Sequence, residues 1–430
     1  MKVLLVGSGG REHALAWALA ASEKCNALYC APGNAGIEAC AECVGIGAED
    51  VQGLVGFAKD KAIDLVVIGP EAPLVAGLAD GLAAVNIAVF GPDKKAAQLE
   101  GSKGFMKDLC AKYDIPTASY GRFTDIEAAQ QFIEDQPGNV VVKADGLAAG
   151  KGVIMCDNKA EAVEAAREML SGGSFGEAGT EIVIEEFMDG EELSYFALAD
   201  GKSVLPLSSA QDHKRAYDGD EGPNTGGMGA YSPAHLMDDA LEQKILERII
   251  QPTIDGMAAE GCPFTGVLYA GIMMVDGEPK LLEYNVRFGD PECQPLMMRL
   301  QGDLLEILDA AAHGRLAEIA DRVSWSDKSA LCVVMATKGY PGSYPKNTVI
   351  KGLEDTAEVK DVTVFHAGTA KDENGQIIST GGRVLGVTAL GETIAEAQRR
   401  AYMGVNKINW PDGFCRKDIG WRALKAEEAA

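Results

Sequence analysis

The sequence predicts a multidomain protein that combines α/β with α+β architecture and begins with a parallel sheet. Its 430 residues correspond to roughly three domains at about 150 residues each. Over the first hundred residues, short apolar runs alternate with helical patterns and end in glycine-rich loops, which is typical of a parallel sheet. The predicted domains are a parallel α/β domain at 1–101, a second domain at 102–327 and a small α+β domain at 328–430.

The N-terminal domain is predicted from four apolar runs. The first, Val3 to Val6, is too short for the apolar region of a signal peptide, so we predict a strand there. Ligands of parallel sheets bind at the carboxyl ends of the strands, which directs attention to the loops that follow them. The predicted strands are 3–6, 27–30, 64–68 and 87–90, and the predicted helices are 12–22 and 74–84.

The remaining two domains mix strands and helices in a less regular order. Their helices follow from apolar positions three to four residues apart, and their strands follow from short apolar runs. The predicted helices are 103–112, 125–134, 159–170, 295–312 and 393–408, and the predicted strands are 140–143, 153–155, 181–187, 266–275, 279–284 and 330–336.

The composition excludes several classes of protein. With 39 basic and 64 acidic side chains the formal net charge is −25, which argues against a nucleic-acid binder and against an anionic-membrane binder. No apolar run approaches the roughly 18 residues of a transmembrane helix, and we expect a cytoplasmic protein. Cys40 and Cys43 have the spacing of a metal or redox pair, but no second pair completes a site, so we expect free thiols at the ten cysteines.

A glycine-rich loop between the first strand and the first helix is a candidate anion site. The dinucleotide-binding fingerprint needs a glycine where this chain has Glu12, and the acid expected after the second strand is missing, so a dehydrogenase is disfavoured. Backbone N–H groups at a helix N-terminus can still hold a phosphate. We therefore predict an anion site at Gly9 and Gly10, with help from the guanidinium of Arg11.

A second glycine-rich loop follows a strand that ends in Lys143. The loop runs from Gly146 to Gly152 and carries Lys151, but it is not the P-loop, which would continue into a helix after Lys and Ser or Thr. A strand lysine beneath a glycine flap is a way to hold nucleotide phosphates. The alternative is an ordinary hairpin with a solvated lysine.

A third candidate lies on the strand that ends near residue 287. Glu283, Asn285 and Arg287 are two residues apart and therefore share one face of an extended chain. A carboxylate and an amide oxygen suit Mg²⁺ bound together with phosphate oxygens. An arginine beside them would meet the charge that develops on a transferred phosphoryl group. A merely solvated strand face is the alternative.

Together, these segments resemble the ATP-grasp fold, in which two α+β subdomains clamp ATP between them. In detail, Arg287–Gln294 is similar to the signature of the phosphoribosylamine–glycine ligase (glycinamide ribonucleotide synthetase) family. This resemblance extends from residue 1 to about residue 425, and it implies a pre-ATP-grasp domain, an ATP-grasp domain with a mobile lid at about 122–188, and a C-terminal α+β domain. Further segments similar to the family are 7–14, 32–36, 101–107, 224–231 and 381–386.

The resemblance implies an ATP-dependent ligation of glycine to 5-phosphoribosylamine in purine biosynthesis, through a glycyl phosphate intermediate. Lys103, Lys143 and Lys151 would contact the ATP phosphates, and the catalytic residues would be Arg287, Lys143 and Asp290. Around the nucleoside it implies Glu185 at the adenine amino group, the backbone of Glu186 and Met188 as the adenine hinge, and Glu192 at the ribose. Glu283 and Asn285 would hold Mg²⁺, with Mn²⁺ as a substitute, and the number of ions is left open because the preceding strand lacks the usual acid.

The acceptor substrates are assigned by the same resemblance. Gly9, Gly10 and Arg11 would contact phosphoribosylamine, and Asp290 would orient its amine. The glycine and amine site would be lined by Asp212, His213, Lys214, Arg215, Asn224, Gly226 and Gly227.

Several alternatives to this assignment remain open. His213 is expected to position substrate rather than act as a base. Phosphoribosylamine would arrive by diffusion or by transient contact with the enzyme that supplies it. The other functions are an ATP-grasp ligase with a different amine, or a non-catalytic nucleotide-binding protein, which would have lost Lys143, Glu283 or Asn285.

Overall fold

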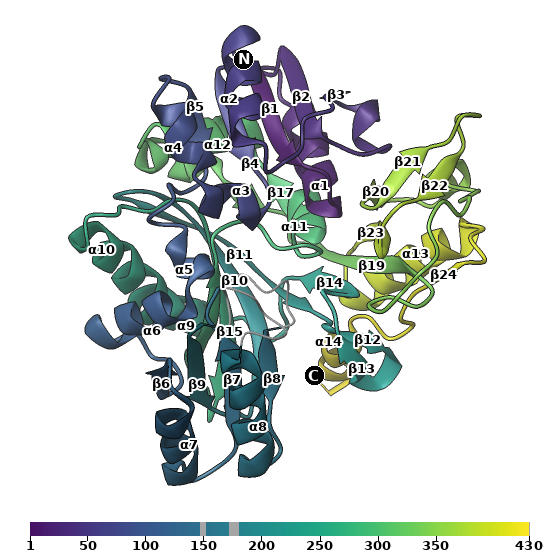
Figure 1. The fold of residues 1–430 in the computed structure, drawn as a ribbon. Coiled ribbons are helices and arrows are strands. Elements are labelled where there is room, and N and C mark those ends of the chain that lie inside the picture. The colour runs from purple at the N-terminus through teal and green to yellow at the C-terminus, as the bar shows by residue number, and fades with distance from the viewer. Residues whose placement is uncertain (147–151, 172–179, 430) are drawn as a thin grey trace.

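The computed structural model describes residues 1–146, 152–171 and 180–429, and its N-terminal part is a five-stranded parallel sheet in the order β3-β2-β1-β4-β5 (Figure 1). Alternate side chains of the first strand enter different cores, with Leu4 and Val6 on one face and Val3 and Leu5 on the other. Both faces are therefore covered, as parallel sheets require. The elements are β1 (Lys2–Gly7), α1 (Gly10–Ala20), β2 (Ala27–Pro32), β3 (Glu42–Cys43), α2 (Val51–Asp60), β4 (Leu65–Ile68), α3 (Glu71–Ala76), α4 (Leu78–Ala83) and β5 (Ala88–Phe90).

Two predicted helices are each interrupted. The predicted helix at 74–84 is divided at Gly77, whose φ of 94° is left-handed and ends α3 before α4 begins. The predicted helix at 295–312 consists of α11 (Cys293–Arg299) and α12 (Leu304–Ala312), with a short strand, β17 (Leu300–Gln301), between them. Asp303 then starts α12 by accepting a hydrogen bond from the Glu306 N–H at 3.1 Å. Apolar periodicity continues through both breaks, so the sequence pattern alone does not reveal them.

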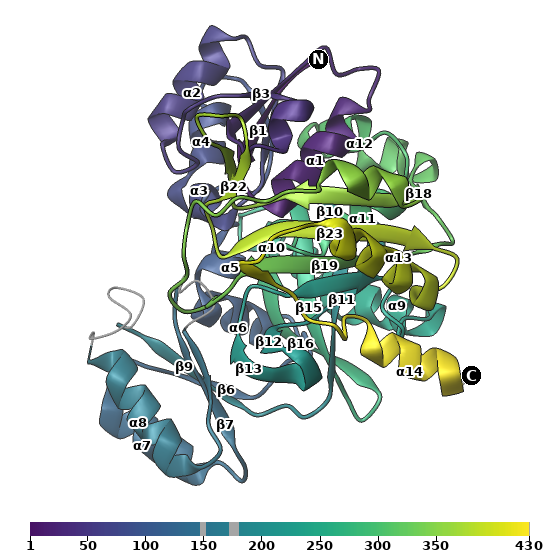
Figure 2. The same cartoon turned by 90° about the vertical axis from the view of Figure 1, so that its right-hand side faces the viewer.

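A four-stranded antiparallel sheet in the order β6-β9-β7-β8 projects from the rest of the molecule, with α7 and α8 on one face (Figure 2). Its core is separate from those of the other sheets and lies between this sheet and its two helices. The elements in and before this region are α5 (Gln98–Gly101), α6 (Lys103–Lys112), β6 (Tyr120–Phe123), α7 (Ile126–Asp135), β7 (Val140–Ala144), β8 (Val153–Met155), α8 (Lys159–Leu170) and β9 (Ile182–Glu186).

A nine-stranded antiparallel sheet joins the central and C-terminal parts of the chain. Its order is β16-β15-β10-β11-β14-β19-β23-β20, with β24 paired to β19. The β14–β19 ladder crosses the predicted boundary at 327, so strands of both predicted domains share one sheet. The strands of this sheet before that boundary are β10 (Glu191–Asp200), β11 (Val204–Asp212), β14 (Gly229–Ser232), β15 (Thr265–Val275) and β16 (Glu278–Asn285). Those after it are β19 (Ser329–Thr337), β20 (Val362–His366), β23 (Arg383–Gly391) and β24 (Gly413–Phe414). Separate two-stranded sheets pair β12 (Arg215–Tyr217) with β13 (Glu221–Asn224), β17 with β18 (Ser324–Trp325), and β21 (Thr369–Lys371) with β22 (Ile377–Ser379).

The remaining α-helices of the described residues are α9 (Asp239–Ile245), α10 (Gln251–Ala259), α13 (Ile394–Lys407) and α14 (Trp421–Ala429). The C-terminal part also packs against α1. The His13 Nδ1 atom accepts the His366 N–H at 2.7 Å, and Asn34 donates to the His366 carbonyl at 2.8 Å. The multidomain α/β and α+β architecture predicted from the sequence is thus confirmed. Within the described part of the chain, none of the helices has the length and apolar character needed to cross a bilayer.

Candidate active site

The lysine at the end of β7 lies in a buried ion-pair cluster. Lys143 Nζ is 2.8 Å from Glu185 Oε1, and Lys107 Nζ is 2.9 Å from Glu185 Oε2. Val141 and Glu185 are partners in the β7–β9 ladder, so Lys143, two residues further on, shares their face of the sheet. The Lys107 and Glu185 side chains are only 0% and 2% exposed, and burial lowers the pKa of Lys107. Each charge in this cluster therefore depends on its partners.

Helix α6, which precedes the four-stranded sheet, holds a third lysine beside Gly146, the first residue of the predicted glycine flap. Lys103 Nζ donates to the Gly146 carbonyl at 3.1 Å. Asp145 accepts from Ser102 Oγ at 3.0 Å and from the Gly104 N–H at 3.1 Å, which attaches the end of β7 to the start of α6. Lys151 and most of the predicted flap lie outside the described residues.

The carboxylate and amide predicted to hold a metal lie on one face of β16. Glu283 pairs with Gly271 and Asn285 pairs with Tyr269 in the β15–β16 ladder. Burial disfavours the charge of Glu283, but the cations Lys214, Lys143 and Lys103 hold the pKa of its carboxyl below the usual value. Glu283 is thus ionised beside three lysines, and these hard oxygen donors fit a divalent cation that is bound together with phosphate oxygens.

Glu192 and Lys214 form an ion pair that lies within electrostatic reach of Glu283. Burial disfavours the charge of Lys214, but Glu192, Asp212 and Glu283 raise its pKa. Burial raises the pKa of Asp212, and Glu292 and Glu192 raise it further while Lys214 opposes them. Asp212, Lys214 and Glu192 are therefore one coupled group of charges that faces Glu283.

The residues of the predicted adenine hinge lie at the end of β9, where Glu186 is the last residue, and just beyond it, where Met188 follows. The Glu186 N–H donates to the Ser119 carbonyl at 3.0 Å, and its carboxylate accepts from Ser119 Oγ at 3.0 Å. Met188 is buried. The hinge backbone is thus fixed by the residues that lead into β6.

Arg287 lies two residues beyond the end of β16 and faces two carboxylates of the N-terminal region. Its Nε is 3.2 Å from Glu71 Oε2, and its Nη2 is 2.9 Å from Glu100 Oε1. Burial disfavours its charge, but Glu100 and Glu71 raise the pKa of Arg287. The guanidinium is therefore held by two partners in a fixed orientation.

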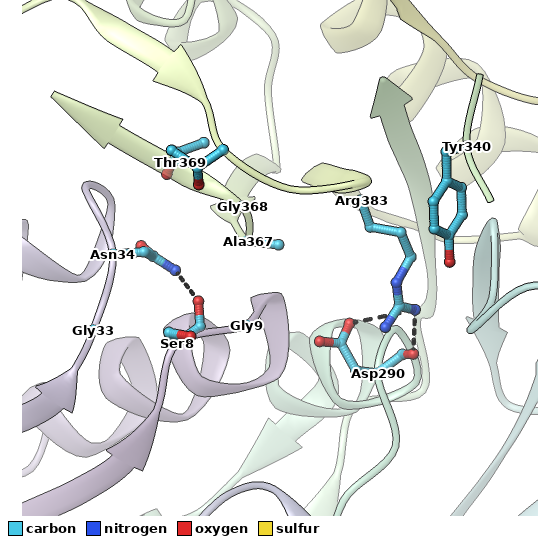
Figure 3. Close-up of a pocket in the computed structure, with 11 residues that line it drawn as sticks. Ser8, Gly9, Gly33, Asn34, Asp290, Tyr340, Ala367, Gly368, Thr369 and Arg383 are labelled. Atoms are coloured by element: carbon cyan, nitrogen blue, oxygen red, sulfur yellow. Dashed lines mark hydrogen bonds and ion pairs between the residues drawn. The ribbon is translucent and has the colours of Figure 1, made fainter. Parts of the chain in front are cut away.

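A pocket of about 300 Å³ lies where the N-terminal, central and C-terminal parts meet. Figure 3 shows Ser8 and Asn34 on one side, Thr369 and Arg383 on another, and Asp290 at the base. Arg383 Nη1 donates to the Asp290 carbonyl at 2.5 Å and lies 3.9 Å from Asp290 Oδ1. The remaining lining residues are Gly9, Gly33, Tyr340, Ala367, Gly368 and Thr380.

Asp290 is the charged centre of this pocket. Burial raises the pKa of its carboxyl, but Arg383 and Arg11 lower the pKa by more, so that the net pKa lies below the usual value. Gln294 Nε2 donates to Asp290 Oδ1 at 2.9 Å, and the Arg11 N–H donates to Oδ2 at 3.2 Å. The carboxylate is thus ionised and fixed in orientation.

The predicted anion site at the first helix has a different arrangement. The Gly9 N–H donates to Glu12 Oε2 at 2.6 Å, and Arg11 Nε donates to Glu12 Oε1 at 2.5 Å. The Arg11 guanidinium is buried and also donates to the Phe288 carbonyl at 3.1 Å. In this conformation Glu12 already supplies the anion that the loop was predicted to bind, and Arg11 does not line the pocket.

The predicted acceptor segment at 212–227 is divided between two environments. His213 is buried against the segment before α14, where its Nε2 accepts the Gly420 N–H at 3.0 Å. Burial, with Arg416 and Arg422, lowers the pKa of His213 to about 3, so the ring is neutral and structural in this conformation.

The rest of this segment is fixed by its own backbone and by the C-terminal part. Arg215 Nη1 donates to the Gly222 carbonyl at 2.7 Å within the β12–β13 hairpin, which ends at Asn224. Arg383 donates to the carbonyls of Gly226 and Gly227.

Several residues of the site do not follow from sequence reasoning. Arg383 and Asn34 lie in segments that resemble the family, so a signal for them existed. Tyr340 and Thr369 have none, because they reach the pocket only through the docking of the C-terminal part. Lys107 lies on α6 one helical turn after Lys103, and this i, i+4 spacing could have pointed to it.

Comparison with known proteins finds relatives that match this chain over almost its whole length. Three family models, described as the N, ATP-grasp (A) and C domains of phosphoribosylglycinamide synthetase, match residues 1–100, 101–293 and 330–422. A phosphoribosylamine–glycine ligase of Agrobacterium fabrum is 58% identical over 429 residues and is covered completely, as is this chain. A chloroplastic enzyme of the same name from Arabidopsis thaliana is 55% identical, with 98% of this chain and 80% of that protein covered.

Solved structures extend the comparison to the fold. The crystal structure of phosphoribosylamine–glycine ligase from Thermotoga maritima has a TM-score of 0.85 at 34% identity, and covers 97% of this chain and 100% of that chain. A biotin carboxylase domain from Hydrogenobacter thermophilus, at 16% identity and a TM-score of 0.73, shares the fold over 96% of this chain and 91% of that one. The chain belongs to the phosphoribosylglycinamide synthetase (phosphoribosylamine–glycine ligase) family of ATP-grasp proteins.

Proposed function

We propose that this chain uses ATP to join glycine to 5-phosphoribosylamine, forming glycinamide ribonucleotide, ADP and phosphate. The observation that carries the proposal is the short segment 283–290, which links two sites. Glu283, among three lysines, stands at one end, and Asp290, in the three-sided pocket, stands at the other. We thus assign phosphoryl transfer to the Glu283 end of this segment and amide formation to its Asp290 end.

On the nucleotide side, Lys103 and Lys143 would contact the ATP phosphates, together with Lys151. Glu185, Glu186 and Met188 would surround the adenine, and Glu192 would accept from the ribose hydroxyls. Lys143 is paired with Glu185 and Lys214 with Glu192 in this conformation, so each charge is satisfied before a nucleotide arrives. Nucleotide binding then exchanges ion pairs instead of desolvating free charges.

Glu283 and Asn285 are the proposed protein ligands of Mg²⁺, and Mn²⁺ would use the same oxygen donors. No cluster of three or more His, Cys, Asp or Glu side chains suited to a metal occurs among the described residues, so phosphate oxygens would supply the other ligands. When bound, such an ion would offset charge on the phosphate oxygens.

The residues fit a two-step reaction. A carboxylate is a poor electrophile, so a glycine oxygen first attacks the terminal phosphorus of ATP; the bond to ADP breaks and glycyl phosphate forms. The amine of phosphoribosylamine then attacks the glycyl carbon, the bond to phosphate breaks, and the amine loses a proton. Arg287, fixed by Glu71 and Glu100, would stabilise the charge on the transferred phosphoryl group.

On the acceptor side, Asp290 would orient the amine, because it is ionised and accepts in fixed directions. Ser8, Asn34, Thr369 and Arg383 would surround the phosphoribosyl group. Gly9 and Gly10 would allow close approach rather than donate N–H groups, since an added Cβ would lie 2.9 Å from Asp290 Oδ2 at Gly9 and 2.5 Å from Gln294 Nε2 at Gly10. Asp212, Lys214, Asn224, Gly226 and Gly227 would line the route between the two sites.

The substrates of this proposal are small molecules, and we place the reaction in the cytoplasm, the location expected from the sequence. The Arabidopsis relative is named as chloroplastic, so the compartment of this chain is a proposal of its own. Transient contact with the enzyme that supplies the labile amine stays a prediction.

The test is ADP release by the purified protein with Mg-ATP, glycine and phosphoribosylamine made in place from ribose 5-phosphate and ammonia. We expect turnover only when all three substrates are present, with loss of turnover in Glu283→Ala. A control with ammonia but no ribose 5-phosphate separates ligation of phosphoribosylamine from ligation of ammonia. Turnover with another acid or amine would overturn the substrate assignment, and nucleotide binding without turnover would favour a regulatory protein.

A further inference from the structure

The segment from Arg416 to Arg422, before and at the start of α14, contacts a hairpin about two hundred residues away in the sequence. Figure 1 shows α14 beside β12 and β13. The Arg416 side chain is 0% exposed. Its Nε and Nη2 each donate to Asp418 at 2.8 Å, and its Nη1 donates to Asp220 Oδ1 at 2.8 Å and to the Arg215 carbonyl at 3.2 Å. A fully buried guanidinium with two carboxylates is costly to assemble, and so requires a reason.

Further contacts surround this arginine. Asp220 Oδ2 accepts from Arg422 Nη2 at 2.6 Å, and the Lys417 N–H donates to Asp218 Oδ1 at 2.7 Å. In the opposite direction, the Gly219 N–H donates to Asp418 Oδ2 at 2.8 Å. The turn of the β12–β13 hairpin is thus bound on both sides by the C-terminal segment.

The C-terminal segment is itself attached to α13. Tyr402 Oη donates to the Arg416 carbonyl at 2.8 Å and accepts the Ile419 N–H at 3.1 Å. Gln398 Nε2 donates to the Ile419 carbonyl at 2.8 Å. The segment is therefore a fixed support, and not a tail that merely rests on the hairpin.

Without the C-terminal segment, the hairpin would have little to hold it in place. All four residues of β13 are exposed, and two-stranded hairpins are marginally stable alone. Yet it connects Lys214 to Asn224, and so joins the two halves of the proposed acceptor segment. Thr225 closes its base, because its N–H and Oγ1 both donate to the Lys214 carbonyl, at 2.7 and 2.9 Å.

We infer that Arg416 is a positioning residue for the acceptor substrates, which acts through the β12–β13 hairpin and touches no substrate itself. Through Asp220 and Arg215 it sets the hairpin, and the hairpin sets Lys214 and Asn224, which lie beside each other at its base. The inference rests on the proposed function, since the segment 212–227 is an acceptor site only if that function is correct.

The test compares Arg416→Met, Arg416→Lys and the control Arg400→Met in the full-length protein. Arg400 lies on α13 and has a similar set of partners, which are Asp361, Glu396 and the Leu390 carbonyl. None of these partners belongs to the β12–β13 hairpin. For Arg416→Met we expect KM for glycine and phosphoribosylamine to rise about tenfold, the effect of one lost charged hydrogen bond, with KM for ATP changed less than about twofold. Arg416→Lys should recover part of the loss, and Arg400→Met should leave all three KM values unchanged.

Hydrogen exchange across 215–227 gives a second readout that needs no turnover. Faster exchange there in Arg416→Met and Arg416→Lys, but not in Arg400→Met, is the expected result. Unchanged exchange would overturn the inference even if the wild-type protein proved inactive, in which case the proposed function fails separately. Equal rises in all three KM values, or faster exchange with unchanged KM values, would also overturn it. If Arg416→Met does not fold, Arg416→Lys carries the test.

Discussion

The proposed nucleotide site and the proposed acceptor pocket are built in opposite ways. At the proposed nucleotide site, Glu283 and Asn285 lie at alternate positions of one strand, β16, and Lys143 and Glu185 lie on two paired strands, β7 and β9. In the pocket, Ser8, Asp290 and Arg383 come from three parts of the chain and meet only after those parts dock. Local patterns in the sequence can therefore describe the first site but not the second.

Their electrostatics differ as well. The proposed nucleotide site places Lys103 and Lys143 near one carboxylate, Glu283, which suits polyanionic ATP in an otherwise acidic protein, whereas Lys214 belongs to the proposed acceptor segment. The pocket instead balances one cation, Arg383, with one anion, Asp290. That arrangement suits a ligand that carries both a phosphate and an amine. A substitution in one site should then change the kinetic constants of that site's substrate and leave those of the other site's substrate unchanged.

The largest effect on activity is expected at the proposed nucleotide site. Glu283→Gln removes the ionised oxygen donor and should lower kcat by at least about a thousandfold, as the loss of major charge stabilisation does. Initial rates of ADP release measure it. Glu278→Gln is the matched control, because Glu278 starts the same strand but is exposed and pairs with Lys244 and Arg248. A Glu283→Gln protein with near wild-type kcat would remove Glu283 from the reaction.

In the pocket, Arg383→Met should raise KM for phosphoribosylamine by about thirtyfold and leave KM for ATP nearly unchanged. The expected size is that of a lost charge-assisted contact of about 2 kcal/mol. Steady-state kinetics with each substrate varied in turn measures the two values. The exposed Arg399, replaced in the same way, serves as the control. A parallel rise in KM for ATP would show that the two sites are not separate.

Acid should lower the free energy of unfolding through two buried histidines, His13 and His366, beside the proposed acceptor pocket. Burial lowers the pKa of His13 to about 3 and that of His366 to about 4, and the two rings meet where the C-terminal part docks. Because the unfolded chain binds protons at pH 6.5 that the folded chain does not, the free energy of unfolding falls as the pH drops from 6.5 toward 4. Each histidine contributes about 1.4 kcal/mol per pH unit, or about tenfold in the unfolding equilibrium.

Urea unfolding at pH 6.5 and 5.0 measures this dependence. His13→Gln keeps an acceptor for the His366 N–H, which His13 Nδ1 accepts at 2.7 Å, but cannot take up the proton. We therefore expect the variant to lose one histidine's share of the slope, while a variant at the exposed His313 keeps the wild-type slope. An unchanged slope in His13→Gln would show that this ring is not buried neutral.

The smallest effect is expected at the loop before α1. Gly9 has a φ of −84°, which alanine adopts without strain, but its Cβ would lie 2.9 Å from both Asp290 Oδ2 and Glu12 Oε2. Gly9→Ala should shift Asp290 and raise KM for phosphoribosylamine about fivefold, a change of about 1 kcal/mol. Gly45→Ala is the control, since a Cβ there meets nothing within 4 Å. Equal kinetics for both variants would mean that Asp290 is not sensitive to this contact.

The difference between the sites also explains how far the sequence could lead. Strand alternation places Glu283 with Asn285, and the apolar run before Lys143 places that lysine at the end of β7. The same reasoning could not reveal that Glu12 takes the Gly9 N–H and the Arg11 guanidinium, because that choice depends on the docking of Phe288 and Asp290.

Continuity of pattern was misleading where the backbone breaks for local reasons. Gly77 divides a predicted helix by adopting a left-handed φ, and β17 divides another by pairing with β18. The ladder between β14 and β19 depends on strands about a hundred residues apart, which no local pattern encodes. Long-range pairing is therefore the part of this fold that only the structure supplies.

The most direct test of two separable sites is the binding of glycinamide ribonucleotide, the stable product, measured by calorimetry with and without Mg-ADP. We predict that both ligands bind to the wild-type protein at once. Arg383→Met should lower the affinity for the ribonucleotide by at least about tenfold, and the affinity of this variant for Mg-ADP should be unchanged. Competition between the two ligands, or ribonucleotide binding that Arg383→Met leaves intact, would contradict the placement of the acceptor in the three-sided pocket.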